Sequence, residues 1–220
     1  MIARKRYEGL PVHVVFITDG SASHPGHPRL SPAAISTLRH QEAREALGIL
    51  GVESGAIHFL NASDGTLNHL APAVRHRLVD ELTRLVATIH PREIFLPCCP
   101  DGSSEHDAAF FFICEALHRA DVFPKVWQYP VWSWWNPVLL IERMIFNARH
   151  CRQPAEDFQF IKARALTHYR SQTHPLEPQV EPALPPELAR IFRSDTEFFF
   201  RFDLLPSGPP LAPDTGRPVI

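Results

Sequence analysis

The sequence predicts an α/β protein with a Rossmann-like three-layer fold and a mostly parallel sheet. Two observations predict this class. Short apolar runs rich in β-branched residues alternate with longer segments in which apolar residues recur at helical spacing. Several of these segments also begin or end at the residues that start and stop helices and strands. Alternation of this kind is typical of a parallel sheet covered by helices.

The first half of the chain holds two strand and helix pairs. Residues 12–20, VHVVFITDG, form a nearly continuous apolar run that suits a strand buried on both faces. The helix predicted over 31–51 starts at an N-cap serine followed by proline and stops at glycine. A second strand is predicted over 56–65, and a second helix over 67–90 with a proline just past it.

The middle of the chain continues the pattern. A third strand is predicted over 93–98 and a third helix over 103–120. Residues 125–135, KVWQYPVWSWW, resemble a fourth strand. Because proline cannot donate to a sheet ladder, Pro130 places this strand toward the edge or end of the sheet.

The last third adds a helix over 160–172 and an aromatic strand over 196–204. With 220 residues, of which 45% are apolar, the chain can bury one sizeable core. We therefore predict a single domain over 1–205, followed by a proline-rich tail over 206–220.

Composition excludes several classes of protein. Lys and Arg number 22 against 24 Asp and Glu, a net charge of −2 with no basic block, so nucleic acid is not an expected partner. The four cysteines show no CxxC spacing, which favours free thiols and a cytoplasmic location. No apolar run has the ~18 residues of a membrane span, and the start lacks a secretory signal.

In a sheet of this class, ligands bind in the loops beyond the carboxyl ends of the strands. These loops are 18–30, 61–68 and 97–106, and none contains GxGxxG or GxxxxGK[ST], so a dinucleotide or P-loop site lacks its glycines. The loops and the start of the following helix instead carry acids and histidines: Asp19, His24, His27, Asp64, Asp101, Glu105, His106 and Asp107.

Six segments resemble, in order, the motifs of one family: VVFITDG, RHQEAREALGILGV, FLNASDGTL, PDGSSEHDAA, YPVWSWW and ARALTHYRSQT. Each motif is weak alone, but six in the right order are specific. They are similar to the PIG-L or LmbE-like family of zinc-dependent N-acetylglucosaminyl deacetylases, and the resemblance covers most of the chain.

The resemblance implies a zinc site and its chemistry. In this family a His and an Asp of a His-Pro-Asp-Asp-Glu motif hold zinc together with a His of the third-helix segment, which corresponds to His106. Three protein ligands leave an open position at which zinc lowers the pKa of water to about 7, and a nearby Asp serves as general base. Arg39 and Asp64 would contact the sugar, and Glu105 would orient a zinc ligand.

The sequence departs from the family at its start. It contains no His-Pro-Asp-Asp, and the His-Pro pairs at His24, His27 and His90, for example, are not followed by acids. The chain resembles the family only from the latter half of the first helix onward, so we expect about 20–30 residues to be missing before Met1. These would hold the first strand, two zinc ligands and the base, and no residue of the chain is assigned as the catalytic base.

Each implied site residue also has a purely structural interpretation. His106 can be a polar residue of a first helical turn, and Glu105 an acid favoured there by the helix dipole. Arg39 can form an ordinary i,i+3 ion pair with Glu42, and Asp64 can simply close an Asp-Gly turn.

Three further features have both a functional and a structural interpretation. Ser103 stands where several family members have a histidine, and we expect it to be the N-cap of the third helix. His24 and His27 form a His-x-x-His that could replace the missing ligands, but their Pro-Gly loop offers little rigidity. The aromatic residues of 127–135 either stack on a sugar or belong to the core.

The sequence therefore predicts a zinc-dependent hydrolase that converts the acetamide of an N-acetylglucosamine-type sugar to amine and acetate, inactive as this shortened chain. One alternative is a catalytically dead binding or scaffolding module of the same fold, because one histidine cannot hold catalytic zinc. Another is a metal-free protein that binds nucleotide sugars. The expected partner is a small amino sugar, and the sequence does not indicate the oligomeric state.

Overall fold

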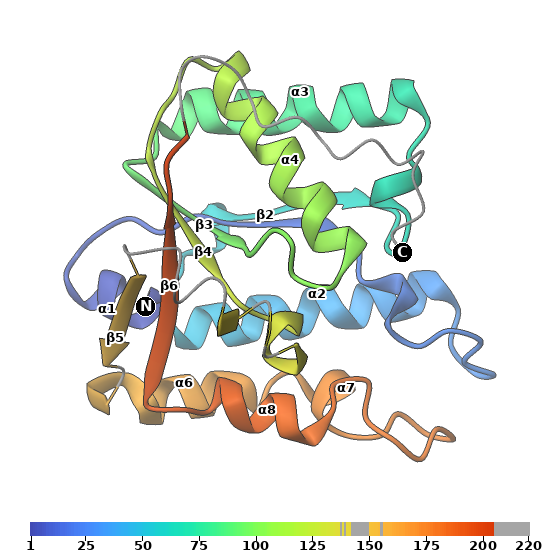
Figure 1. The fold of residues 1–220 in the computed structure, drawn as a ribbon. Helices are drawn as coiled ribbons and strands as arrows, with labels where there is room; N and C mark the ends of the chain where they lie inside the picture. The colour runs from blue at the N-terminus through green and yellow to red at the C-terminus, as the bar shows by residue number, and fades with distance from the viewer. Residues whose placement is uncertain (137, 139, 142–149, 155, 205–220) are drawn as a thin grey trace. The chain divides into compact units, whose positions relative to one another are not determined.

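The computed structural model describes residues 1–136, 138, 140–141, 150–154 and 156–204 (Figure 1). The predicted tail, 206–220, lies outside these residues. The α/β class is confirmed, with helices and strands alternating along the chain. The chain divides into two compact units, each made of two chain segments, and the single domain expected over 1–205 stays a prediction. The first unit comprises Met1–Gly65 and Arg152–Glu197, and the second comprises Thr66–Cys151 and Phe198–Ile220.

A pair of parallel strands forms the sheet of the first unit. In its register, Val14 lies opposite Ile57 and Phe16 opposite Phe59, and the two phenylalanine rings stack with centroids 5.0 Å apart. The elements of this unit are α1 (Ile2–Tyr7), β1 (Val14–Thr18), η1 (Ser21–Ser23), α2 (Pro32–Ile49), η2 (Ser54–Ala56), β2 (Ile57–Ala62), η5 (Glu156–Phe158), α6 (Gln159–Leu166), α7 (Arg170–Thr173) and α8 (Pro186–Phe192).

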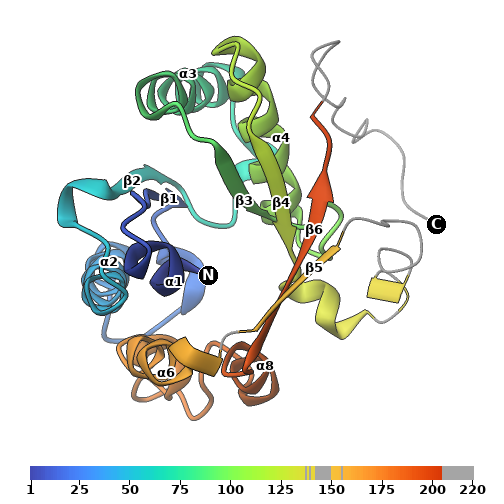
Figure 2. The ribbon, with the colours of Figure 1, turned by 90° about the vertical axis from the view of Figure 1, so that its left-hand side faces the viewer.

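The longest helix of the first unit, α2, follows its sequence signals. The Ser31 hydroxyl accepts the Ala34 N–H (3.2 Å), which makes Ser31 the N-cap with Pro32 in the first turn. The helix lies along the strand pair (Figure 2), where the His40 ring packs at 4.1 Å from the Phe59 ring. The N-cap at Ser31 therefore fixes the N-terminus of α2 directly after the loop that leaves β1.

Two predictions for this unit were wrong in detail. Strand β1, expected to be buried on both faces, is half-buried along its whole length. Among the described residues it pairs only with β2, so one edge is not covered by a strand. The helix predicted over 160–172 is broken into α6 and α7, because the chain turns at residues 167–169.

The four-stranded sheet is mixed. Strands β3 and β4 are parallel, with Glu93 opposite Lys125, and β4 pairs antiparallel with β6, with Val126 opposite Phe202. Its strand order is β3-β4-β6-β5. Helices α3 and α4 pack together beside β3 and β4 (Figure 2). The elements not yet named are η3 (Leu67–His69), α3 (Pro72–Ile89), β3 (Glu93–Pro97), α4 (Ser104–Arg119), β4 (Lys125–Tyr129), η4 (Trp132–Trp135), β5 (His150–Pro154) and β6 (Thr196–Phe202).

The fourth predicted strand was too long and was placed wrongly. Strand β4 ends at Tyr129, and the residues after Pro130 form the 3-10 helix η4. Because Pro130 follows the strand, it does not interrupt the ladder, and β4 lies inside the sheet between β3 and β6. Neither β5 nor α8 was predicted. No helix in the described part of the chain is long and apolar enough to cross a membrane.

Candidate functional site

The second unit contains a fully buried carboxylate, Asp101, in the loop between β3 and α4. Its Oδ2 lies 2.6 Å from His106 Nδ1 and accepts the Trp132 N–H (3.0 Å). Its Oδ1 accepts the N–H groups of Val131 (3.1 Å) and Ser133 (3.1 Å) and the Ser133 hydroxyl (2.7 Å). One carboxylate therefore joins the start of α4 to the turn after β4.

The hydrogen bonds of Asp101 decide its charge. Burial alone would raise the pKa of this carboxyl, but the bonds from His106, Ser133, Val131 and Trp132 outweigh burial and hold the pKa below its usual range. An ionised carboxylate only accepts hydrogen bonds, so His106 Nδ1 must carry the proton.

The imidazole of His106 is thereby held in one orientation. With the proton on Nδ1, Nε2 of the neutral ring bears the lone pair that a metal requires. The side chain is 26% exposed, and none of its hydrogen bonds within the described chain involves Nε2. His106 thus has the geometry of a ligand whose second nitrogen is fixed by a carboxylate.

The first turn of α4 positions this pair. The Ser103 hydroxyl accepts the His106 N–H (3.5 Å), which confirms Ser103 as N-cap. The Asp101 N–H donates to Asp107 Oδ1 (3.1 Å). Burial raises the pKa of Asp107, against the hydrogen bonds from Asp101 and Cys99. Gly102, at φ 81°, supplies the left-handed turn that lets the chain fold back between the two aspartates.

Glu105 faces a different partner. Its Oε1 accepts the Leu67 N–H (2.8 Å), so this carboxylate helps to hold η3 against α4. The acid that contacts the His106 ring is Asp101. Sequence reasoning counted Asp101 among the loop acids but gave it no role, and it missed Ser133 altogether. The sequence signal for this contact was the position of Asp101, five residues before His106 and directly before Gly102.

The first unit has its own buried carboxylate, Glu42, on α2. It is 5% exposed and accepts the N–H (2.7 Å) and hydroxyl (2.7 Å) of Ser171 in α7. Arg39, one turn earlier, donates from Nη1 to Glu42 at 3.4 Å, and its guanidinium lies 5.7 Å from the centre of the Tyr169 ring. The i,i+3 pair is therefore formed, and it sits within a network that holds Arg39 in place.

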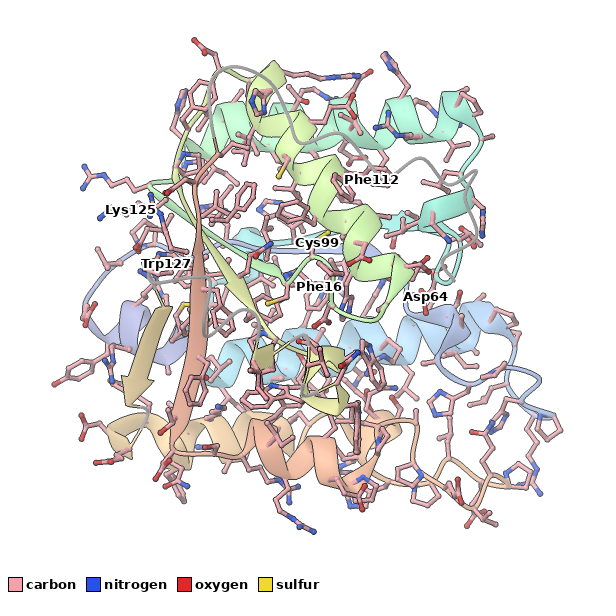
Figure 3. The ribbon with its side chains drawn as sticks, in the orientation of Figure 1. Phe16, Asp64, Cys99, Phe112, Lys125 and Trp127 are labelled. Atoms are coloured by element: carbon pink, nitrogen blue, oxygen red, sulfur yellow. The ribbon has the colours of Figure 1, made fainter. Side chains whose placement is uncertain are left out.

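Asp64 follows β2 in the same unit (Figure 3). Its Oδ2 accepts the Ala22 N–H (3.1 Å), and its own N–H donates to Asp19 Oδ1 (3.3 Å). Asp64 thus ties the loop after β1 to the loop after β2, as a turn-closing residue does. It also interacts electrostatically with Arg39, which places the two predicted sugar contacts in one neighbourhood.

The predicted residues fall into two sets. Arg39 and Asp64 belong to the first unit, while Glu105 and His106 belong to the second. Within the described residues, no three His, Cys, Asp or Glu side chains come together to hold a metal ion. His106 fits the role of one zinc ligand, and the described residues do not supply a full set.

Comparison with solved structures places this fold among known proteins. The N,N'-diacetylchitobiose deacetylase of Pyrococcus horikoshii is similar at 18% identity and TM-score 0.64, over 97% of this chain and 80% of that one. A zinc-inhibited form of the teicoplanin deacetylase Orf2 is similar at 17% identity and TM-score 0.57, over 91% of this chain and 90% of that one. The 4-carboxy-2-hydroxymuconate hydratase GalB of Pseudomonas putida KT2440 is similar at 14% identity and TM-score 0.65, over 96% of this chain and 90% of that one.

These likenesses confirm the Rossmann-like fold. Because one of these proteins is a hydratase, they do not by themselves define the reaction. No curated protein matches the sequence. The model of the PIG-L family, GlcNAc-PI de-N-acetylase, matches residues 1–117, which include α2, β2 and the His106 segment. The chain therefore belongs to the PIG-L family.

Proposed function

We propose that the protein acts as an N-deacetylase on an N-acetylglucosamine-type amino sugar, releasing acetate and the free amine, with His106 as one ligand of a zinc ion. The observation that supports this most directly is the 2.6 Å contact between His106 Nδ1 and Asp101. It orients Nε2 as a ligand atom before any metal arrives. Family membership supplies the reaction class.

Each part of the chain has a separate task in this proposal. When bound, zinc supplies a Lewis acid that polarises the acetamide carbonyl. Asp101 holds the imidazole, and Ser133 holds Asp101. Arg39, fixed by Glu42, and Asp64 present a donor and an acceptor suited to sugar hydroxyls. The general base is not assigned to any residue of the chain.

A second function is favoured by one observation. The described residues gather no three-ligand metal group, and one histidine binds zinc weakly. The protein would then be a catalytically inactive member of the family that keeps the sugar-binding residues and binds its ligand without turnover.

Metal content distinguishes the two functions. The described residues provide one zinc ligand, so the test uses the full-length protein, including any residues encoded before Met1. Dialysed against zinc and then against buffer, it should retain about one zinc ion per molecule by mass spectrometry, and His106→Ala should lose it. The matched control is His76→Ala, which removes a 63% exposed histidine of α3 in the same unit. Asp101→Asn should weaken zinc binding by about 10–100-fold.

Substrate turnover completes the test. Release of amine from N-acetylglucosamine derivatives should depend on added zinc and disappear in His106→Ala. If wild-type protein holds no more zinc than His106→Ala and releases no amine, the deacetylase proposal is wrong and the inactive binding module takes its place. A side-chain 15N NMR spectrum of His106 gives a readout free of activity: the ring should carry its proton on Nδ1 in wild type and lose this preference in Asp101→Asn.

A further inference from the structure

The loop after η1 turns two histidines inward. His24 is 2% exposed and His27 is 9% exposed, whereas Pro25 and Gly26 between them are exposed. The two rings meet edge to face, with centroids 6.4 Å apart. The Nε2 atoms of both are buried, and neither has a hydrogen-bond partner among the described residues. Buried polar atoms of this kind are rare in folded proteins, and each calls for an explanation.

The tautomer of His27 follows from its other nitrogen. Nδ1 accepts the backbone N–H groups of Arg29 (3.2 Å) and Leu30 (3.0 Å), so it carries no proton. In the neutral ring the proton must then be on Nε2, which is a donor without an acceptor. A metal ion cannot replace that proton without forcing an anionic ring. His27 is therefore a poor metal ligand, which argues against the His24-x-x-His27 pair as a substitute for the missing zinc ligands.

A third buried nitrogen without a partner lies nearby. Arg39 Nε is buried and has no partner in the described chain. Arg39 and His27 both interact electrostatically with His24. The Arg39 side chain also packs on the backbone of Gly20, where a Cβ would lie 3.4 Å from Nε. The three nitrogens thus belong to one neighbourhood, between the loop after β1 and the first half of α2.

The charges of this neighbourhood limit what it can bind. Burial lowers the pKa of His24, a hydrogen bond from the ring to the Ser171 backbone carbonyl opposes this, and Arg39 and His27 lower it further, so the ring is neutral at pH 7. The positive charge of Arg39 is offset by Glu42 and Asp64. A dianion such as phosphate would meet no net positive charge here. An uncharged oxygen acceptor would satisfy the donors without adding charge.

We propose that His24 Nε2, His27 Nε2 and Arg39 Nε form a subsite for a hydroxyl or carbonyl oxygen of an uncharged saccharide. The ligand class rests on the proposed function, since an amino sugar carries such oxygens around its ring. The subsite itself needs neither zinc nor His106. His24 and His27 are specificity residues in this assignment, and they act by hydrogen bonding alone.

Two substitutions of His27 separate ligand binding from loop structure. In His27→Asn, the amide oxygen lies where Nδ1 was and still accepts from Arg29 and Leu30, but the Nε2 donor is lost. In His27→Gln, the amide reaches the position of Nε2, but the acceptor within the loop is lost. A purely structural His27 predicts that Asn is tolerated and Gln is harmful. A ligand-binding His27 predicts that Asn abolishes most binding even though its melting temperature stays close to wild type.

The test is an NMR titration of the full chain with N-acetylglucosamine and with glucose, in buffer containing EDTA. Both sugars should bind wild type, because both present ring hydroxyls, and both should shift the His24 and His27 side-chain resonances. His27→Asn should raise the Kd of each sugar about tenfold, as expected for one lost hydrogen bond. Should His27→Asn not fold, Arg39→Lys is the second variant, since it keeps the charge but has no Nε donor.

The result that overturns the inference is specific. If wild type binds neither sugar, or if the folded His27→Asn protein binds both as tightly as wild type, the buried nitrogens face only ordered water and the subsite does not exist. His76→Ala, which removes an exposed histidine of α3, should bind both sugars like wild type. If wild type binds the sugars in EDTA but releases no amine when zinc is added, the proposed deacetylase function is wrong. The subsite is supported in that case.

Discussion

The two units each bury a polar cluster, and the clusters differ in how fully they are satisfied. In the second unit, Asp101 accepts hydrogen bonds from one histidine, one serine hydroxyl and three backbone N–H groups. In the first unit, His24, His27 and Arg39 each keep one buried nitrogen without a partner in the described chain. The hydrogen-bonded network around Asp101 fixes the His106 imidazole in place. The buried nitrogens of His24, His27 and Arg39 remain available to a ligand.

Both clusters also contain a central carboxylate that joins distant segments. Asp101 links residues about 30 positions apart, whereas Glu42 links α2 to Ser171, 129 positions away. In both units a buried carboxylate accepts several hydrogen bonds. Asp101 thereby orients the His106 ring, whereas Glu42 joins α2 to α7.

Replacing Asp101 should have the largest effect on stability. Asp101→Ala leaves the Ser133 hydroxyl, three backbone N–H groups and the His106 ring without their buried acceptor. We expect the free energy of unfolding to fall by about 3–5 kcal/mol, measured by urea denaturation. Asp64→Ala is the control, because Asp64 is only half-buried and should cost about 1 kcal/mol. Equal losses of stability in Asp101→Ala and Asp64→Ala would show that the hydrogen bonds to buried Asp101 contribute no more than those of half-buried Asp64.

Replacing Glu42 should have a smaller effect that depends on the substituent. Glu42→Ala removes the acceptor of the Ser171 N–H and hydroxyl and of Arg39, and should cost about 2–4 kcal/mol. Glu42→Gln keeps one carbonyl acceptor and should cost about half as much. A double-mutant cycle with Ser171→Ala should show coupling of about 1 kcal/mol. Additive effects would mean that the carboxylate does not join α2 to α7 energetically.

Mild acid should destabilise the protein through its buried histidines. The pKa of His24 is below its ordinary 6.5 because of burial, so the unfolded chain takes up a proton at higher pH than the folded protein does. Stability is therefore full above pH 6.5 and falls as the pH drops from 6.5 toward the folded pKa. His40 and His58 act in the same direction.

The measurement is urea unfolding between pH 7.5 and 5. His24→Gln should reduce the loss of stability across this range, since glutamine does not titrate, while His76→Gln, on the exposed face of α3, should not. Hydrogen exchange should show that acid affects the amides of α2 before those of α4. An unchanged pH dependence in His24→Gln would mean that its ring is protonated alike in both states.

Much of the fold followed from local signals. Ser31 and Pro32 marked the start of α2, and Ser103 marked that of α4, because capping depends on neighbouring residues only. The turn after Pro130 was missed for the opposite reason. Residues 131–135 have strand-like composition, but the N–H groups of residues 131–133 bond to the Asp101 carboxylate about thirty positions away, which no local pattern reveals.

The candidate site shows the same division. Resemblance to the family pointed to His106, and the roles of Arg39, Asp64, Glu105 and His106 stay predictions. Neither the orienting acid nor the tautomer of His27 could be derived from the sequence. Both depend on which backbone groups meet a side chain in the folded chain.

The division of each unit into two chain segments bears on how the protein is made. The first unit closes only when Arg152–Glu197 is added to Met1–Gly65, and the sheet of the second closes when Phe202 reaches Val126. At a synthesis rate of about 5–20 residues per second, β1, β2, β3 and β4 leave the ribosome several seconds before their last partners. The nascent chain thus exposes apolar strands for that interval, and we expect its yield in cells to depend on chaperones that shield them.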